Sequence, residues 1–154
     1  MRIVLDTNAL IRAHARVPLL ARRLLRAILQ HNHRLVLSNE ILAEVTKVLR
    51  YPRFQHLYGL TDSELLEYVQ FLQSVSELIP LDHSYWAPLR DPSDLIVLQT
   101  AEREEADILC TKDDDFFDRR VQAYCAARGI EVCDEGRSLS GSSERTATLK
   151  LCHD

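Results

Sequence analysis

The sequence predicts an α/β protein with a mainly parallel central sheet and helices on both of its faces. Two observations predict this class. Four short runs have the apolar and β-branched character of strands, and the segments between them show the apolar periodicity of helices. The four runs are residues 2–5, 34–37, 107–110 and 130–133.

The segments between these runs predict the helices, in order, at residues 19–29, 39–49, 61–79, 91–105 and 119–128. Pro18 suits the first turn of the first helix, and Pro52 ends the second. The third begins at a capping-box sequence whose cap is Thr61, and Gly129 ends the last. Residues 80–90 are predicted to be an ordered loop.

Length and composition predict one domain, residues 1–136, followed by a mobile tail at 137–154 that is rich in Ser, Thr and Gly. No stretch contains the roughly 18 uncharged apolar residues that a membrane span requires. The N-terminus lacks the pattern of an export signal, and the four cysteines show no metal-ligand spacing. We therefore expect a reduced, cytoplasmic protein without membrane contact.

Charge is unevenly distributed along this chain of net charge −4. Residues 9–39 contain no acid and several arginines, of which we take Arg12, Arg22, Arg23 and Arg26 as candidates for contact with phosphate groups. Such a basic segment on an acidic protein is typical of a phosphate-facing surface. It is equally typical of a solvated helix face that pairs with acids of a partner, and the charge pattern alone leaves both interpretations open.

Two of the candidate acids follow predicted strands. Asp6 comes directly after the first strand, and Asp113 follows the third, in the run Thr111-Lys112-Asp113-Asp114-Asp115. Because the carboxyl ends of parallel strands meet at one edge of the sheet, we expect Asp6 and Asp113 to share that edge. Each also has a simpler interpretation, since Asp is a common helix cap and turn residue.

Two further acids come from helices. Glu44 lies about 100° from the centre of the apolar stripe of its helix, so it borders the buried face and can reach the sheet edge. Asp94 lies in the first turn of a helix that begins at Asp91-Pro92 and continues into four apolar residues, so this helix is expected to be buried against the sheet. Boundary glutamates are common without any function, and the helix dipole stabilises a first-turn acid without any ligand.

Taken together, Asp6, Glu44, Asp94 and Asp113 come from four segments that the predicted topology brings to one edge. Clustered carboxylates without His or Cys partners suit hard cations with oxygen ligands, such as Mg²⁺ or Mn²⁺. Ions of this kind support phosphoryl transfer, in which a bound water is activated and the leaving oxygen is stabilised.

Four motifs in order resemble the PIN domain, and more narrowly the VapC-like ribonuclease toxins of bacterial toxin–antitoxin systems. They are Asp6-Thr7-Asn8, the run from Ser38 to Val45, Arg90-Asp91-Pro92-Ser93-Asp94, and Thr111-Lys112-Asp113-Asp114-Asp115-Phe116. Each motif is weak alone, but their order and spacing over residues 1–134 are specific.

The resemblance implies a three-layer α/β/α sandwich and Mg²⁺- or Mn²⁺-dependent cleavage of RNA that leaves a 5′-phosphate and a 3′-hydroxyl. It assigns the catalytic acids to Asp6, Glu44, Asp94 and Asp113, with Asp115 as a possible fifth ligand. Asp6 and Asp113 would hold the ion or ions, together with Asp94 and Asp115. Asp94 and Glu44 would complete the shell or orient the attacking water. The supporting polar positions are Asn8 and Thr111. The implied partners are an RNA substrate, a cognate antitoxin and a second copy of the chain. With RNA as the substrate, Arg12, Arg22, Arg23 and Arg26 become our candidates for RNA contact.

Three other classes compete with this interpretation. A haloacid-dehalogenase-like phosphatase needs a second Asp where this chain has Asn8, and a receiver domain needs a late Lys in a context that Lys112 does not provide. A PIN-like module that binds RNA or protein without cleaving is the main alternative. The presence of all four acids counts against it.

Overall fold

The computed structural model describes residues 1–14 and 20–134 and shows a parallel sheet of five strands in the order β3-β2-β1-β4-β5. The strands are β1 (Arg2–Leu5), β2 (Arg34–Ser38), β3 (Ser76–Ile79), β4 (Ile108–Cys110) and β5 (Glu131–Cys133). The prediction of a mainly parallel sheet is confirmed. The predicted tail at 137–154, the domain end at 135–136 and Pro18 lie outside the described residues.

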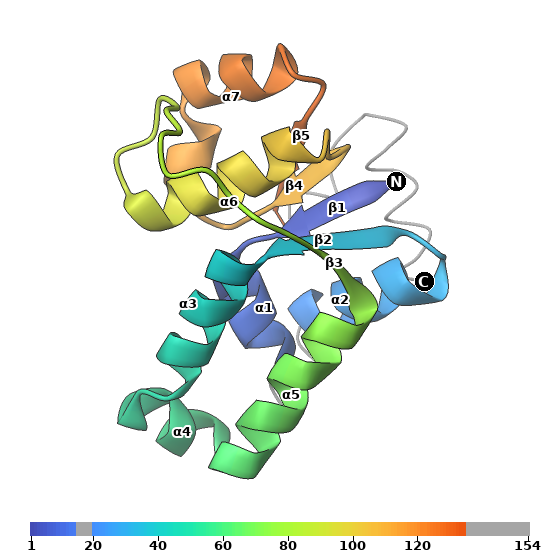
Figure 1. Ribbon diagram of the computed structural model, residues 1–154, viewed down its shortest axis with the longest axis vertical. Coiled ribbons are helices and arrows are strands. Elements are labelled where there is room, and N and C mark those ends of the chain that lie inside the picture. The colour runs from blue at the N-terminus through green and yellow to red at the C-terminus, as the bar shows by residue number, and fades with distance from the viewer. Residues whose placement is uncertain (15–19, 135–154) are drawn as a thin grey trace.

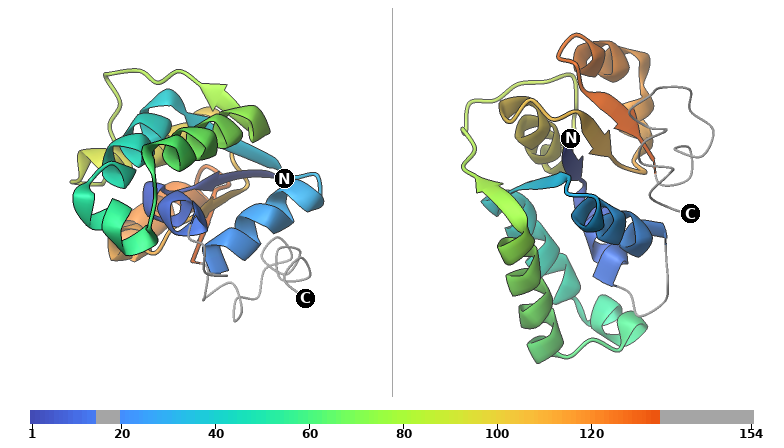
Figure 2. Two further views of the ribbon diagram at one scale, coloured as in Figure 1. Left: turned by 90° about the horizontal axis from the view of Figure 1, so that it is seen from below. Right: turned by 90° about the vertical axis from the view of Figure 1, so that its right-hand side faces the viewer.

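Helices flank this sheet as the α/β/α arrangement requires. They are α1 (Thr7–His14), α2 (Leu20–Gln30), α3 (Asn39–Leu49), α4 (Pro52–Tyr58), α5 (Asp62–Val75), α6 (Pro92–Arg103) and α7 (Arg119–Ala126), with the 3-10 helix η1 at Asp114–Phe117. In Figure 1, α3, α4 and α5 extend beyond the sheet on one side and α7 lies on the other. The second view of Figure 2 shows α6 and α2 on opposite faces of the central strands.

The core fills the spaces between these layers. The three apolar residues Ile3, Val4 and Leu5 of β1 are fully buried, because β1 is the middle strand and has layers on both faces. Cys110 and Cys133 are buried in β4 and β5, as expected for small apolar side chains in strands. Within the described ranges, no helix has the length and apolar content to cross a membrane.

One strand was predicted as helix. The helix that begins at the Thr61 capping box ends at Val75, and residues Ser76–Ile79 form β3, which pairs with β2 at the sheet edge. Ile79, assigned to a helical stripe, is instead the single buried side chain of this strand. Pairing with β2, a tertiary contact, overrides the local helical periodicity here.

Two short helices were not predicted, and one was predicted to be more buried than it is. Helix α1 starts directly after Asp6, and α4 starts at Pro52, the residue predicted only to end α3. In α6, burial is restricted to residues 97–101, while Leu95 and Ile96 are half-buried.

Candidate metal centre

The candidate site lies where the direction of the chain through the sheet reverses. From β1 the chain continues to β2 and β3 on one side, and β4 then returns to pair with β1 on the other side. Sites in open α/β sheets form in the crevice at such a reversal, beyond the carboxyl ends of the strands. Asp6 follows β1 and Thr111 follows β4, so both stand at this crevice.

Asp6 is buried, with 6% of its surface exposed, and both of its carboxylate oxygens accept hydrogen bonds. The Ala9 amide donates to Oδ1 at 2.5 Å, so Asp6 does cap α1. The Thr111 hydroxyl donates to Oδ2 at 2.5 Å and thereby joins the ends of β1 and β4. These two bonds fix the orientation of the Asp6 carboxylate at the crevice.

Three carboxylates from two distant segments converge beside this crevice. Asp94, in the first turn of α6, Asp113, at the N-cap of η1, and Asp115 each offer an oxygen, and these oxygens lie within 4.8 Å of one another. Asp113 is held from both sides, because its amide donates to the Thr111 hydroxyl and its Oδ1 accepts from the Asp115 amide. We call these three residues the acidic group.

Electrostatics at the acidic group disfavour ionisation of Asp94. Burial is the largest cause, and the charges of Asp113, Asp91, Asp115 and, least, Asp6 add to it, raising the pKa of Asp94 to about 7. A divalent cation would remove this penalty. Three carboxylates with no nitrogen or sulfur donor in the group fit Mg²⁺ or Mn²⁺ rather than a softer metal.

Glu44 is not part of the acidic group and is not among the acids that raise the pKa of Asp94. Its side chain is 28% exposed on α3, and Oε2 pairs with Lys47 on the same helix at 3.4 Å. The structure therefore brings together three of the predicted metal ligands, places Asp6 at the adjoining crevice, and leaves Glu44 with a local partner. Asn8, in the first turn of α1, is exposed.

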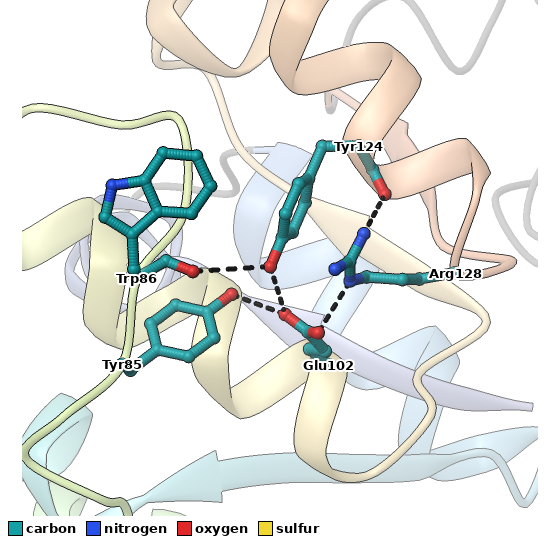
Figure 3. Close-up of polar contacts among 5 residues, drawn as sticks. All are labelled: Tyr85, Trp86, Glu102, Tyr124 and Arg128. Atoms are coloured by element: carbon teal, nitrogen blue, oxygen red, sulfur yellow. Dashed lines mark hydrogen bonds and ion pairs between the residues drawn. The ribbon is translucent and has the colours of Figure 1, made fainter.

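The loop of residues 80–91 delivers the chain to Asp94 and is fixed by a polar cluster shown in Figure 3. The Glu102 carboxylate accepts from the Tyr85 hydroxyl at 2.6 Å and from the Tyr124 hydroxyl at 2.9 Å, and it pairs with Arg128 Nε at 2.6 Å. Although burial acts to raise the pKa of Glu102, these donors hold it below its ordinary value. The Arg128 guanidinium also stacks 3.4 Å from the Tyr124 ring centroid.

A cavity of about 370 Å³ adjoins the acidic group and shares Asp115 with it. Its walls come from loop 80–91, η1 and α7, and it is lined by Pro88, Leu89, Arg90, Asp115, Asp118, Arg120 and Val121. No role was predicted for Arg90 or Arg120 from the sequence. One feature of the sequence could have pointed to them: each arginine lies within five residues of a predicted acid, Asp94 or Asp115.

The predicted RNA-contacting arginines lie on another surface. Arg22 and Arg26 of α2 line a separate cavity of about 300 Å³ together with His14, Tyr68 and Phe71, and no member of the acidic group reaches it. Arg23 is exposed on the same helix, and Arg12 lies on α1.

This architecture is similar to that of a solved protein, and the sequence matches a family model. A solved chain of VapBC2 from Rickettsia felis, bound to a DNA fragment from their promoter, superposes with a TM-score of 0.59 at 17% identity, covering 87% of this chain and 98% of that chain. No curated protein sequence matches. The family model of the PIN domain matches residues 2–115, a range that contains Asp6, Glu44, Asp94, Asp113 and Asp115. The chain therefore belongs to the PIN domain family.

Proposed function

We propose that this protein is a metal-dependent endoribonuclease that hydrolyses RNA phosphodiester bonds, and that it is the toxin of a type II toxin–antitoxin system. One observation carries the nuclease proposal: Asp94, Asp113 and Asp115 converge within 4.8 Å beside the crevice where Asp6 ends β1. Such an oxygen-only group suits the ions that support phosphoryl transfer.

The contacts of each acid suggest its role in the proposed reaction. Asp6 and Asp113 both form hydrogen bonds with Thr111, and both would bind the cation. Asp94 and Asp115 complete the shell. Bound Mg²⁺ or Mn²⁺ would supply a water of lowered pKa and neutralise charge on the leaving oxygen. Glu44, which pairs with Lys47 in the structure, would orient the attacking water, and hydrolysis would leave a 5′-phosphate and a 3′-hydroxyl.

The test is cleavage of a structured RNA pool by the purified protein in Mn²⁺, Mg²⁺ or EDTA. We expect cutting that requires a metal and falls at least about 100-fold in Asp6→Asn. Asp114→Asn is the matched control, because Asp114 is an exposed neighbour of the acidic group but not a member of it. If the wild-type protein neither cuts nor binds metal, the non-cleaving PIN module becomes the better description.

The partner proposals rest on the fold and on the structural neighbour. The VapBC2 complex from Rickettsia felis supports a cognate antitoxin for this chain as well. We further propose a cytoplasmic homodimer. Coexpression with the product of a neighbouring small gene tests the first proposal, because that product should silence a toxin. Light scattering of the purified protein without that product tests the second, because a homodimer should have twice the mass of the chain.

A further inference from the structure

We propose that the cavity beside the acidic group is a nucleotide subsite, in which Arg90 and Arg120 bind a phosphate next to the scissile one. Trp86 does not line the cavity but lies two residues before Pro88, which does, and it stacks on a base of the same strand. This inference rests on the proposed ribonuclease function and names how its substrate is held. The cavity volume, about 370 Å³, falls in the range of roughly 300–1,000 Å³ that is usual for small-ligand sites.

Position is the first argument. The cavity shares Asp115 with the acidic group, so a strand whose phosphate lies at the acidic group continues directly into the cavity. Its walls come from loop 80–91 and the start of α7, which are the two segments that flank Asp94 and Asp115 in space. A neighbouring nucleotide of the same strand is therefore the ligand that this geometry favours.

Unused charge is the second argument. Arg90 and Arg120 are both exposed, and within residues 1–14 and 20–134 neither guanidinium takes part in an ion pair or a hydrogen bond. By contrast, Arg103 and Arg128 pair with acids. Arg90 lines the cavity from the loop and Arg120 lines it from α7. Guanidinium groups match the oxygens of a phosphate, which arginine binds in a forked geometry.

An exposed aromatic ring on a fixed backbone is the third argument. Trp86 is 74% exposed, although its neighbours on either side are held in place. The Tyr85 hydroxyl bonds Glu102, the Trp86 carbonyl accepts from the Tyr124 hydroxyl at 3.4 Å, and Ala87 is buried. Figure 3 shows the indole pointing away from the Glu102 carboxylate.

A ring exposed to this extent contributes little to the packing of the folded chain, and its open face can stack on a base. Single-stranded RNA is bound in this way, by aromatic faces interleaved with arginines along the backbone path. An acidic peptide would also satisfy the two arginines, but it has no planar group for the indole. RNA is therefore the occupant that uses all three side chains.

The sequence offers a direct probe, because Trp86 is the only tryptophan. We would titrate a short single-stranded oligouridine into the protein carrying Asp94→Asn, with Mg²⁺ present, and follow tryptophan fluorescence. Stacking should quench the fluorescence saturably. Arg120→Gln should weaken this binding at least about fivefold and lower the salt dependence by about 0.7 per lost phosphate contact.

Arg119→Gln is the matched control, since Arg119 is an exposed arginine of the same helix turn that does not line the cavity. It should bind as the parent does. Arg90→Gln should behave like Arg120→Gln, while Trp86→Ala, followed by anisotropy of labelled RNA, should bind about tenfold more weakly and Trp86→Phe should restore most of the affinity. Thermal unfolding of each variant verifies that the fold is intact.

The outcomes separate this inference from the proposed function. Metal-dependent cleavage with equal RNA affinity in Arg119→Gln, Arg120→Gln and Arg90→Gln overturns the subsite but leaves the nuclease intact. RNA binding with the expected pattern, but no cleavage in any metal, supports the subsite and rejects the nuclease. Quenching by a polyglutamate peptide but not by RNA overturns the subsite in favour of a protein partner.

Discussion

Replacing Asp94 with Asn should stabilise the protein in the absence of metal, and the effect should grow with pH. The folded protein raises the pKa of Asp94 from 3.8 to about 7. The stability associated with the protonated carboxyl is therefore fully present below about pH 4 and is lost as the pH rises through about 7. Asn cannot ionise, so the variant avoids this loss.

The magnitude follows from the same values. One unit of pKa corresponds to about 1.4 kcal/mol, so a fully shielded group would cost about 4 kcal/mol when ionised. Asp94 is only half-buried, and solvent screening reduces the cost to about 1–2 kcal/mol. From this we subtract about 0.5 kcal/mol for the lost interaction with the dipole of α6. The net gain of about 1 kcal/mol should raise the melting temperature by about 2–4 °C.

The assay is thermal unfolding of both proteins in EDTA between about pH 4 and pH 8.5. As a control, Asp62→Asn removes a first-turn acid from α5, where no acidic group is present, and should slightly destabilise the protein. With saturating Mn²⁺ the order should reverse, because the wild type gains binding energy that Asp94→Asn loses. If Asp94→Asn behaves like Asp62→Asn in EDTA at pH 8, Asp94 is an ordinary cap-region acid and the electrostatic argument is wrong.

Three further predictions follow from the site and its surroundings. Thr111→Val removes the hydroxyl that bonds the Asp6 carboxylate and should lower the free energy of unfolding, measured in urea, by about 1–3 kcal/mol. If Thr46→Val, a change on the surface of a helix, lowers it equally, the bond from Thr111 to Asp6 has no special importance for stability. Mn²⁺ affinity measured by calorimetry should rise between about pH 5 and 8, since a proton on Asp94 competes with the ion, and a flat profile would contradict a shared site. The third change reverses three arginines of α2, Arg22, Arg23 and Arg26. It should weaken RNA binding, measured by filter binding, and flatten the salt dependence of that binding. Lys47→Glu is the control, and if the triple variant binds RNA as tightly as Lys47→Glu does, this surface does not contact RNA.

The parallel sheet could be predicted because the sequences of its inner strands have a recognisable apolar pattern. Residues of β1, β2 and β4 are apolar on both faces, as strands between two helical layers must be. The edge strand β3 has one buried residue, so its pattern does not differ from the end of the preceding helix. Its strand conformation comes from hydrogen bonds to β2, which no local pattern encodes.

Only the part of the candidate site that follows from the sheet topology could be predicted from the sequence. Parallel strand ends share an edge, and this places Asp6 near the loop that carries Asp113. The distance between Asp94 and Asp115 depends on how loop 80–91 packs on α7, through contacts of Glu102 with Tyr85, Tyr124 and Arg128 that are far apart in sequence. The cavity beside Asp115 depends on that packing as well, so no sequence spacing reveals it.

The central position of β1 has a consequence for the timing of activity during synthesis. The first strand made carries Asp6, but its partner β4 and the acids after it lie more than 100 residues later. A nascent chain therefore cannot assemble the centre until nearly all of the described fold has left the ribosome. Under the proposed function, the growing chain would therefore lack nuclease activity until its synthesis is nearly complete.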